Sequence, residues 1–192
     1  LSITNCICHQ VVKFYLQLVI EISYMLLYNY SINKTNRHKN QRNKKEVIMY
    51  YCCGITDKGV MDHNEDAYMI GSSVQTEGSI NCMLDVPFIA GVSDGVSGEN
   101  FGEIASRKCL EFLSRANFHS NIDLRKTVMR VHHDLNSFGS KNSKTKNMQA
   151  TLCAIAIDER ENIHTINVGD SRMYRYRKGD IKQISRDQSL VQ

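Results

Sequence analysis

The 192 residues are 42% hydrophobic and 23% charged, which is the composition of an ordinary globular protein and excludes a fibrous or a wholly disordered chain. The net charge of +4 comes mainly from a basic stretch between residues 34 and 45. Residues 49–192 carry 17 basic and 18 acidic side chains, so we expect no nucleic-acid-binding surface over the body of the protein.

Residues 1–48 differ in composition from the rest of the chain. The stretch from Val11 to Tyr30 is largely apolar but contains Lys13 and Glu21 within it, which is too polar for a clear membrane span. It also lacks the small-residue cleavage site of a secretory signal. We expect residues 1–48 to be a leader of doubtful status. It is either a weak membrane anchor or a stretch translated upstream of the working protein, and residues 49–192 form the folded domain.

The seven cysteines form no Cys-x-x-Cys pair, and their number is odd. Without a credible signal peptide, this pattern favours reduced thiols in the cytoplasm. If the leader is an anchor, the alternative is a membrane-tethered protein that faces the cytoplasm.

In the first half of the domain, short apolar runs bounded by turn residues predict strands. They cover residues 50–55, 67–70, 80–84 and 87–92. We expect the last two strands to pair through a turn at Asp85, and residues 71–79 to form a loop. Apolar residues at helical spacing predict helices over residues 100–117 and 123–137. Asp123 is the expected N-cap of the second helix and Gly139 its C-cap.

The second half of the domain reads as strands joined by short turns. The expected strands cover residues 151–158, 163–168, 171–177 and 181–185. Four such strands predict an antiparallel meander. A block of strands, two helices that cover one sheet, and then further strands together indicate an α+β fold.

Acidic residues recur where predicted strands begin or end. Asp94 follows a buried run and is flanked by Gly91, Gly95 and Gly98, whereas Glu65 and Asp66 precede the strand at 67–70. Carboxylates held at strand ends suit a hard cation. Two ordinary explanations stay open at this point, because Asp-Gly is a common turn dipeptide and acidic runs are often only solvated loops.

Four segments, taken in order, resemble the metal-dependent protein phosphatase family (PPM, the type 2C serine/threonine phosphatases), and in particular its small bacterial members. They are Asn64-Glu-Asp-Ala67, Val92-Ser-Asp-Gly-Val-Ser-Gly98 with Gly102-Glu-Ile-Ala-Ser106, Met148-Gln-Ala-Thr-Leu152, and Asn167-Val-Gly-Asp-Ser-Arg-Met-Tyr174 with Ser185-Arg-Asp-Gln-Ser189. The resemblance implies a four-layer α-β-β-α sandwich of two antiparallel sheets flanked by helix pairs, incomplete at the C-terminus.

The resemblance also implies a reaction and the residues that support it. Family members hydrolyse phosphoserine and phosphothreonine with a water activated by two Mn²⁺ or Mg²⁺ ions. By the match of motifs, Asp94 would bridge both cations and Gly95 would offer its backbone carbonyl to one of them. Glu65 and Asp66 would hold that cation's waters. Asp170 would either bind a further, weaker cation or have only a structural role in its turn.

Arg172 and Asp187 are expected to be structural, and two departures from the family pattern bear on activity. Met61 stands where the resemblance implies a phosphate-binding arginine, so the substrate phosphate would lose a bidentate partner. The sequence ends at Gln192, before the motifs that would supply the remaining ligands, and we therefore expect a C-terminally truncated form with impaired activity.

The resemblance leaves two functions open. The first is a monomeric phosphoprotein phosphatase that acts on targets of a serine/threonine kinase. The alternative is a non-catalytic pseudophosphatase that binds phosphoproteins through the same sandwich, which Met61 favours and the Glu65, Asp66 and Asp94 carboxylates disfavour.

Overall fold

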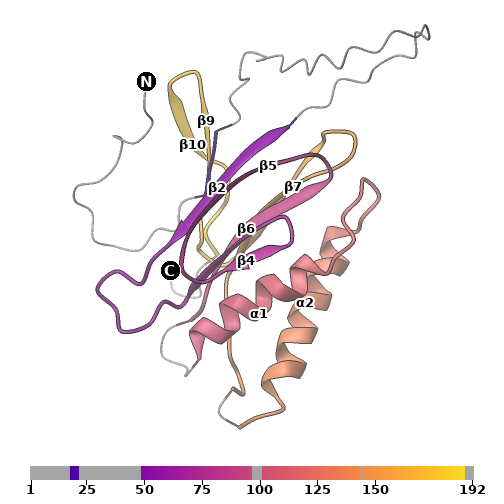
Figure 1. Ribbon diagram of the computed structural model, residues 1–192. Helices are drawn as coiled ribbons and strands as arrows, with labels where there is room; N and C mark the ends of the chain where they lie inside the picture. Colours follow the sequence, from indigo (N-terminus) through magenta and orange to yellow (C-terminus); the bar gives the residue numbers. More distant parts are fainter. Residues whose placement is uncertain (1–17, 22–48, 97–100, 144, 189–192) are drawn as a thin grey trace, which may run out of the picture.

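The computed structural model describes residues 18–21, 49–96, 101–143 and 145–188, and gives only the backbone for residues 18–21. Two helices are present in this part of the chain, α1 (Gly102–Ser114) and α2 (Leu124–Gly139) (Figure 1). The strands are β1 (Leu18–Glu21), β2 (Tyr50–Thr56), β3 (Asp66–Ile70), β4 (Ser73–Gln75), β5 (Gly78–Leu84), β6 (Phe88–Asp94), β7 (Leu152–Ile157), β8 (Ile163–Val168), β9 (Met173–Arg177) and β10 (Asp180–Gln183).

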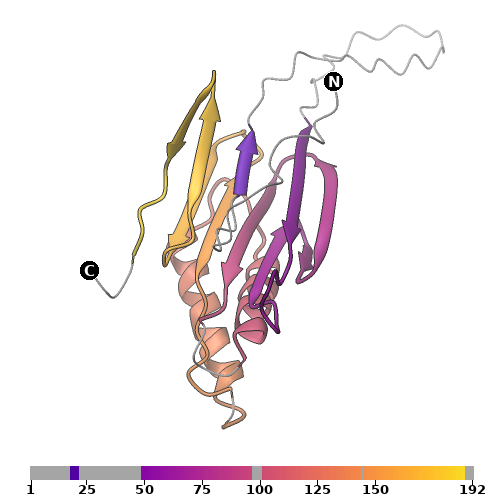
Figure 2. The ribbon, with the colours of Figure 1, turned by 90° about the vertical axis from the view of Figure 1, so that its left-hand side faces the viewer.

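The central layer is a five-stranded sheet in the order β4-β3-β6-β7-β8, in which every neighbouring pair is antiparallel. Both helices lie on one side of this sheet, and α1 packs on β3, β4 and β6 (Figure 1). The other side faces two smaller sets of strands, the β2-β5 pair and the set β1-β9-β10. Figure 2 shows these two sets as separate groups of strands.

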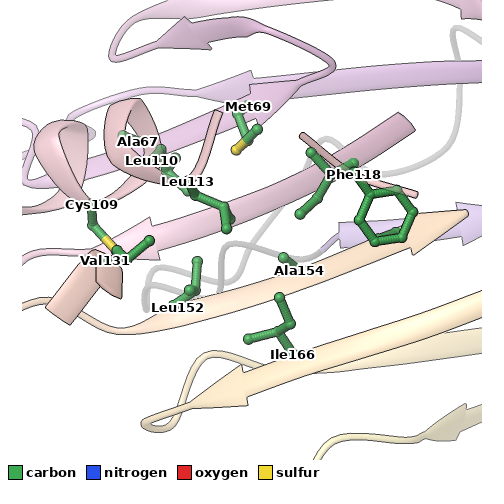
Figure 3. Packing of buried hydrophobic residues seen from close by; sticks show 12 residues of the cluster. Ala67, Met69, Cys109, Leu110, Leu113, Phe118, Val131, Leu152, Ala154 and Ile166 are labelled. Carbon is green, nitrogen blue, oxygen red and sulfur yellow. The ribbon is translucent and has the colours of Figure 1, made fainter. Parts of the chain in front are cut away.

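Residue alternation along β3 explains why both faces of the central sheet are apolar. Ala67 and Met69 pack with Leu110 and Leu113 of α1 in the core beneath the helices (Figure 3). The intervening Tyr68 and Ile70 instead belong to the core that faces β2 and β5. The five-stranded sheet is therefore buried between two layers, which fixes the positions of its strand ends.

Helix α2 begins where its sequence predicts, because the Asp123 side chain accepts a hydrogen bond from the backbone N–H of Lys126 at 3.0 Å. The expectation for its other end is wrong, since Gly139 is the last helical residue and Ser140 is the C-cap. A side chain at Gly139 would place its Cβ 2.7 Å from the carbonyl oxygen of Thr145. The close approach of the Thr145 backbone therefore explains why a glycine occupies this position.

Two expected strand pairings are wrong. β5 pairs with β2 rather than with β6, so that consecutive strands belong to different sheets. The expected meander divides after β8, because β9 pairs with β10 and with β1 rather than with β8. The expected loop at residues 71–79 also contains β4 and the first residues of β5.

The α+β class and the packing of two sheets are confirmed. Two details of the four-layer expectation differ: β1 pairs with β9 in parallel, and the described residues contain only one helix pair. Of residues 1–48, only 18–21 are described, so the predicted boundary at residue 48 and the predicted apolar segment stay predictions. Neither described helix combines the length and the apolar composition that spanning a membrane requires.

Candidate metal centre

The acidic residues singled out by the sequence meet at one end of the central sheet. Asp66 on β3 is the register partner of Asp94 on β6. On the other side of Asp94, Thr151 donates its backbone N–H to the Asp94 carbonyl at 2.8 Å, directly before β7. Gly169 follows β8, and a Cβ built at this glycine would lie 2.8 Å from Cγ2 of Thr151. We call Asp66 and Asp94, together with Asp170 directly after Gly169, the acidic row.

The alternation of side chains directs the acidic row toward the space between the sheets. Tyr68 and Ile70 on β3, and Ala90 and Val92 on β6, pack toward β2 and β5. Asp66 and Asp94 are two residues from Tyr68 and Val92, so their side chains lie on the same face of the sheet. Both aspartates are partly buried, whereas Asp170 is exposed.

The two aspartates perturb each other strongly. Burial raises the pKa of Asp94 well above its ordinary value, and the charge of Asp66 together with a hydrogen bond between the two carboxyl groups raises it further. Smaller contributions come from the charges of Asp170 and Glu65. Burial also raises the pKa of Asp66, although its hydrogen bond with Asp94 acts in the opposite direction. The charges of three other acids therefore act on Asp94, where a cation would be attracted.

Glycines bring Glu65 into the same region. A Cβ at Gly95 would overlap the carbonyl group of Gly102 in the first turn of α1, so only glycine permits this close approach. A Cβ at Gly102 would lie 3.1 Å from Oε1 of Glu65 and 3.2 Å from the carbonyl oxygen of Gly95. The absence of a side chain at Gly102 thus lets two oxygen acceptors approach its backbone closely, and the sequence had singled out both of them.

The donor chemistry of this region suits a hard divalent cation, because Mg²⁺ and Mn²⁺ prefer carboxylate and carbonyl oxygens. The number of donors is smaller than expected. Within the described residues, no group of three His, Cys, Asp or Glu side chains is gathered closely enough to hold a metal ion. The described chain therefore supplies a close pair of aspartates with further oxygens nearby, rather than a complete coordination shell.

Three residues that the sequence analysis quoted in motifs without a role hold the acids in place. Asn64 donates to the Thr56 hydroxyl at 2.9 Å and to the Thr76 carbonyl at 2.7 Å, and its own oxygen accepts from the backbone of Asp66 at 3.1 Å. On the other side, the Thr151 hydroxyl accepts a hydrogen bond from the backbone N–H of Asp94 at 3.0 Å and lies 2.6 Å from the hydroxyl of Ser171. For Asn64 and Ser171, the signal that could have identified them was a small polar residue one or two positions from an acid, whereas Thr151 has no acid near it in the sequence.

The remaining predicted residues lie outside the acidic row. Met61 lies in the loop before β3 and is 48% exposed. Arg172 donates from Nε and Nη2 to the Asp187 carboxylate, at 2.9 and 2.6 Å to Oδ2. The structural role expected for this pair agrees with its geometry, because the bidentate contact ties the segment after β10 to the start of β9.

This ion pair predicts a specific dependence of stability on pH. Hydrogen bonds from Arg172 hold the pKa of Asp187 below its ordinary value. The stabilisation is therefore present above the unfolded pKa of about 4, and is lost as the pH falls through the lower folded value. We expect the difference in Tm between the wild-type protein and Asp187→Asn to be largest above about pH 5 and to shrink toward about pH 3. Thermal melts over this range measure it, and a difference that does not vary with pH would contradict the assignment.

Known proteins resemble this chain in both sequence and fold. The chain is 30% identical over 146 residues to a serine/threonine phosphatase Stp of Listeria monocytogenes, with 71% of this chain and 54% of the relative aligned. The corresponding protein of Listeria innocua is 29% identical over the same length. The chain thus spans about half the length of the curated relatives it matches. No family model matches it.

Solved structures extend this likeness to the fold. A bacterial serine phosphatase superposes with a TM-score of 0.58 at 26% identity, covering 76% of this chain and 57% of the other. The serine/threonine phosphatase Stp1 of Staphylococcus aureus gives a TM-score of 0.57 at 23% identity, with 81% and 59% covered. PstP/Ppp of Mycobacterium tuberculosis gives 0.57 at 21%, with 76% and 57% covered. At these last two identities the likeness concerns the fold alone.

Proposed function

This chain belongs with the PPM-type serine/threonine phosphatases by sequence and by fold, and from this premise we propose that it contributes to a metal-dependent phosphoprotein phosphatase. The reaction is hydrolysis of phosphoserine or phosphothreonine in protein substrates. The observation that carries the proposal is the pairing of Asp66 and Asp94 across β3 and β6 at one end of the sheet. Two partly buried carboxylates that lie this close together are unfavourable unless a proton or a cation neutralises them.

The proposed ligands follow from the positions of the oxygens. Asp94 would hold both cations, and the Gly95 carbonyl would bind one of them. Glu65 and Asp66 would hold the waters of that cation, which accords with the close approach of Glu65 and Gly95 to the Gly102 backbone. Asp170 contributes charge from the edge of the site, either to a weaker cation or to the stability of its turn.

When bound, Mn²⁺ or Mg²⁺ ions lower the pKa of a water molecule and neutralise charge on the phosphoryl oxygens. The residues of the chain then hold the ligands at fixed spacing, because the backbone of Asp94 is hydrogen-bonded to the backbone N–H and to the hydroxyl of Thr151. No side chain of the described residues needs to act as a covalent nucleophile.

The relatives favour this enzyme over the pseudophosphatase alternative, since their names describe phosphatases. Met61 in place of the phosphate-binding arginine predicts a weak affinity for substrate phosphate rather than an absent reaction. The five described cysteines are free thiols, which supports a reducing compartment such as the cytoplasm. We further propose that the protein acts as a monomer on targets of a serine/threonine kinase.

Release of phosphate from a synthetic phosphothreonine peptide tests the proposal. We expect the 192-residue chain to release phosphate when Mn²⁺ is present and to stop when EDTA is added in excess. The same peptide with threonine in place of phosphothreonine controls for contaminating phosphate. Saturable binding of the phosphopeptide without turnover, at every Mn²⁺ concentration, would support the pseudophosphatase instead.

A further inference from the structure

Thr151 occupies an unusual position in the central sheet. In a regular antiparallel pair the N–H of Asp94 would donate to the backbone carbonyl of Thr151. In this structure the N–H of Asp94 donates instead to the Thr151 hydroxyl at 3.0 Å. The Thr151 carbonyl accepts a hydrogen bond from the Ser93 hydroxyl at 2.6 Å. The side chain of Thr151 has therefore replaced its own carbonyl in the hydrogen-bond ladder, directly beside the aspartate of the candidate site.

The Thr151 hydroxyl also makes a second contact, with Ser171. Oγ1 of Thr151 lies 2.6 Å from Oγ of Ser171, and either hydroxyl can donate. Ser171 immediately follows Asp170, in the turn that Gly169 opens with φ of 99°. Gly169 in turn packs against Cγ2 of Thr151. One threonine thus contacts both the backbone of Asp94 and the turn that carries Asp170.

We infer that Thr151 and Ser171 are positioning residues whose hydroxyl pair fixes the spacing between Asp94 and the turn that carries Asp170, and thereby sets the affinity of the acidic row for a divalent cation. The inference rests on the proposed function, because it concerns the cation of that site. Its physical basis is general: residues that orient metal ligands change affinity by about 10- to 100-fold when they are lost. A hydroxyl is required here because only a group that accepts from Asp94 while bonding to Ser171 can link the two.

Three variants separate the effect of the hydroxyl from the effect of side-chain shape. Thr151→Val keeps the volume and removes the hydroxyl, whereas Thr151→Ser keeps the hydroxyl and removes a methyl group. Ser171→Ala breaks the link to the turn but leaves the bond between Asp94 and Thr151. Thr165→Val on the neighbouring strand β8 is the matched control, because its side chain is exposed and outside the acidic row.

The first measurement is the Kd for Mn²⁺ of each variant of the 192-residue chain, from the electron paramagnetic resonance signal of free Mn²⁺. We expect Thr151→Val to raise the Kd by about 10- to 100-fold and Ser171→Ala by about 3- to 10-fold. Thr151→Ser should remain within about 3-fold of the wild type, and Thr165→Val should not differ from it. Equal Kd values for the wild type, Thr151→Val and Ser171→Ala would overturn the inference, as would a loss in Thr151→Ser as large as in Thr151→Val.

The second measurement needs no metal and distinguishes this inference from the proposed function. Amide hydrogen exchange of the metal-free protein should be at least about 10-fold faster at Asp94 in Thr151→Val, and faster at Asp170 in Ser171→Ala. Thr151→Ser should protect Asp94 as the wild type does. If the wild type binds no Mn²⁺, the proposed function fails, and the exchange rates alone then decide whether the hydroxyl pair positions the row. Unchanged rates in both variants would overturn the positioning role.

Discussion

Replacement of Asp94 by asparagine is expected to abolish the response of the protein to Mn²⁺. In the wild type, Mn²⁺ at about 100 times its Kd should stabilise the folded state by about 2.7 kcal/mol, which raises Tm by about 5 to 10 °C. In Asp94→Asn this increase should disappear, because the amide cannot supply the negative charge that attracts the cation. Differential scanning fluorimetry with and without Mn²⁺ measures the effect.

The same variant should lose turnover of the phosphothreonine peptide by at least about 100-fold, since even residues that only orient metal ligands contribute about 10- to 100-fold. Its metal-free stability provides the control for misfolding. Asp66 and Asp94 hold two like charges close together with no neutralising cation in the metal-free protein, so removing one charge should leave the metal-free Tm unchanged or raise it. Retained Mn²⁺ stabilisation or retained turnover in Asp94→Asn would refute the role assigned to this residue.

Truncation of Leu110 is the second change with a large expected effect. Leu110 is fully buried on α1 and packs in the core between the helices and the central sheet (Figure 3). Leu110→Ala should cost about 2 to 5 kcal/mol, from lost burial and from the cavity that remains. For a protein of this size, each kcal/mol lowers Tm by about 2 to 4 °C. We therefore expect Tm to fall by roughly 4 to 20 °C in thermal melts.

Met129→Ala on α2 is a suitable control for that experiment, because Met129 is 58% exposed and also helical. Its replacement should change the free energy of unfolding by no more than about 0.5 kcal/mol. Similar melting temperatures for Leu110→Ala and Met129→Ala would mean that the helices are not packed on the sheet as described.

Local pattern was sufficient to predict most of the individual elements. Helix α2 follows from apolar residues three and four positions apart, and its start from the Asp123 cap, which the structure confirms. β3 follows from a short apolar run after an acidic segment. These predictions succeed because helical period and capping depend on residues close in sequence.

The pairing of strands could not be predicted in the same way. β5 and β6 are adjacent in sequence and both apolar, so a hairpin was the natural expectation. Apolar residues face both sides of β6, however, because it lies in the middle of a sheet that is covered on both faces. A strand of that kind gives no indication of which neighbour it pairs with, and β5 instead pairs with β2 in the layer above.

The candidate site was accessible from sequence only in part. Asp94, Glu65 and Asp66 could be named from their motifs, but the register that pairs Asp66 with Asp94 depends on strands β3 and β6 meeting in the fold. The role of Thr151 was hidden for a similar reason. Its hydroxyl contacts Asp94 and Ser171, which lie 57 and 20 residues away along the chain.

The central claim is that a divalent cation binds at the paired aspartates of β3 and β6. Crystals of the 192-residue chain soaked in Mn²⁺, with anomalous diffraction data collected near the manganese absorption edge, test it directly. The account predicts an anomalous peak within about 2.5 Å of a carboxylate oxygen of Asp94. Manganese bound only elsewhere on the protein, with no peak at Asp94, would contradict it.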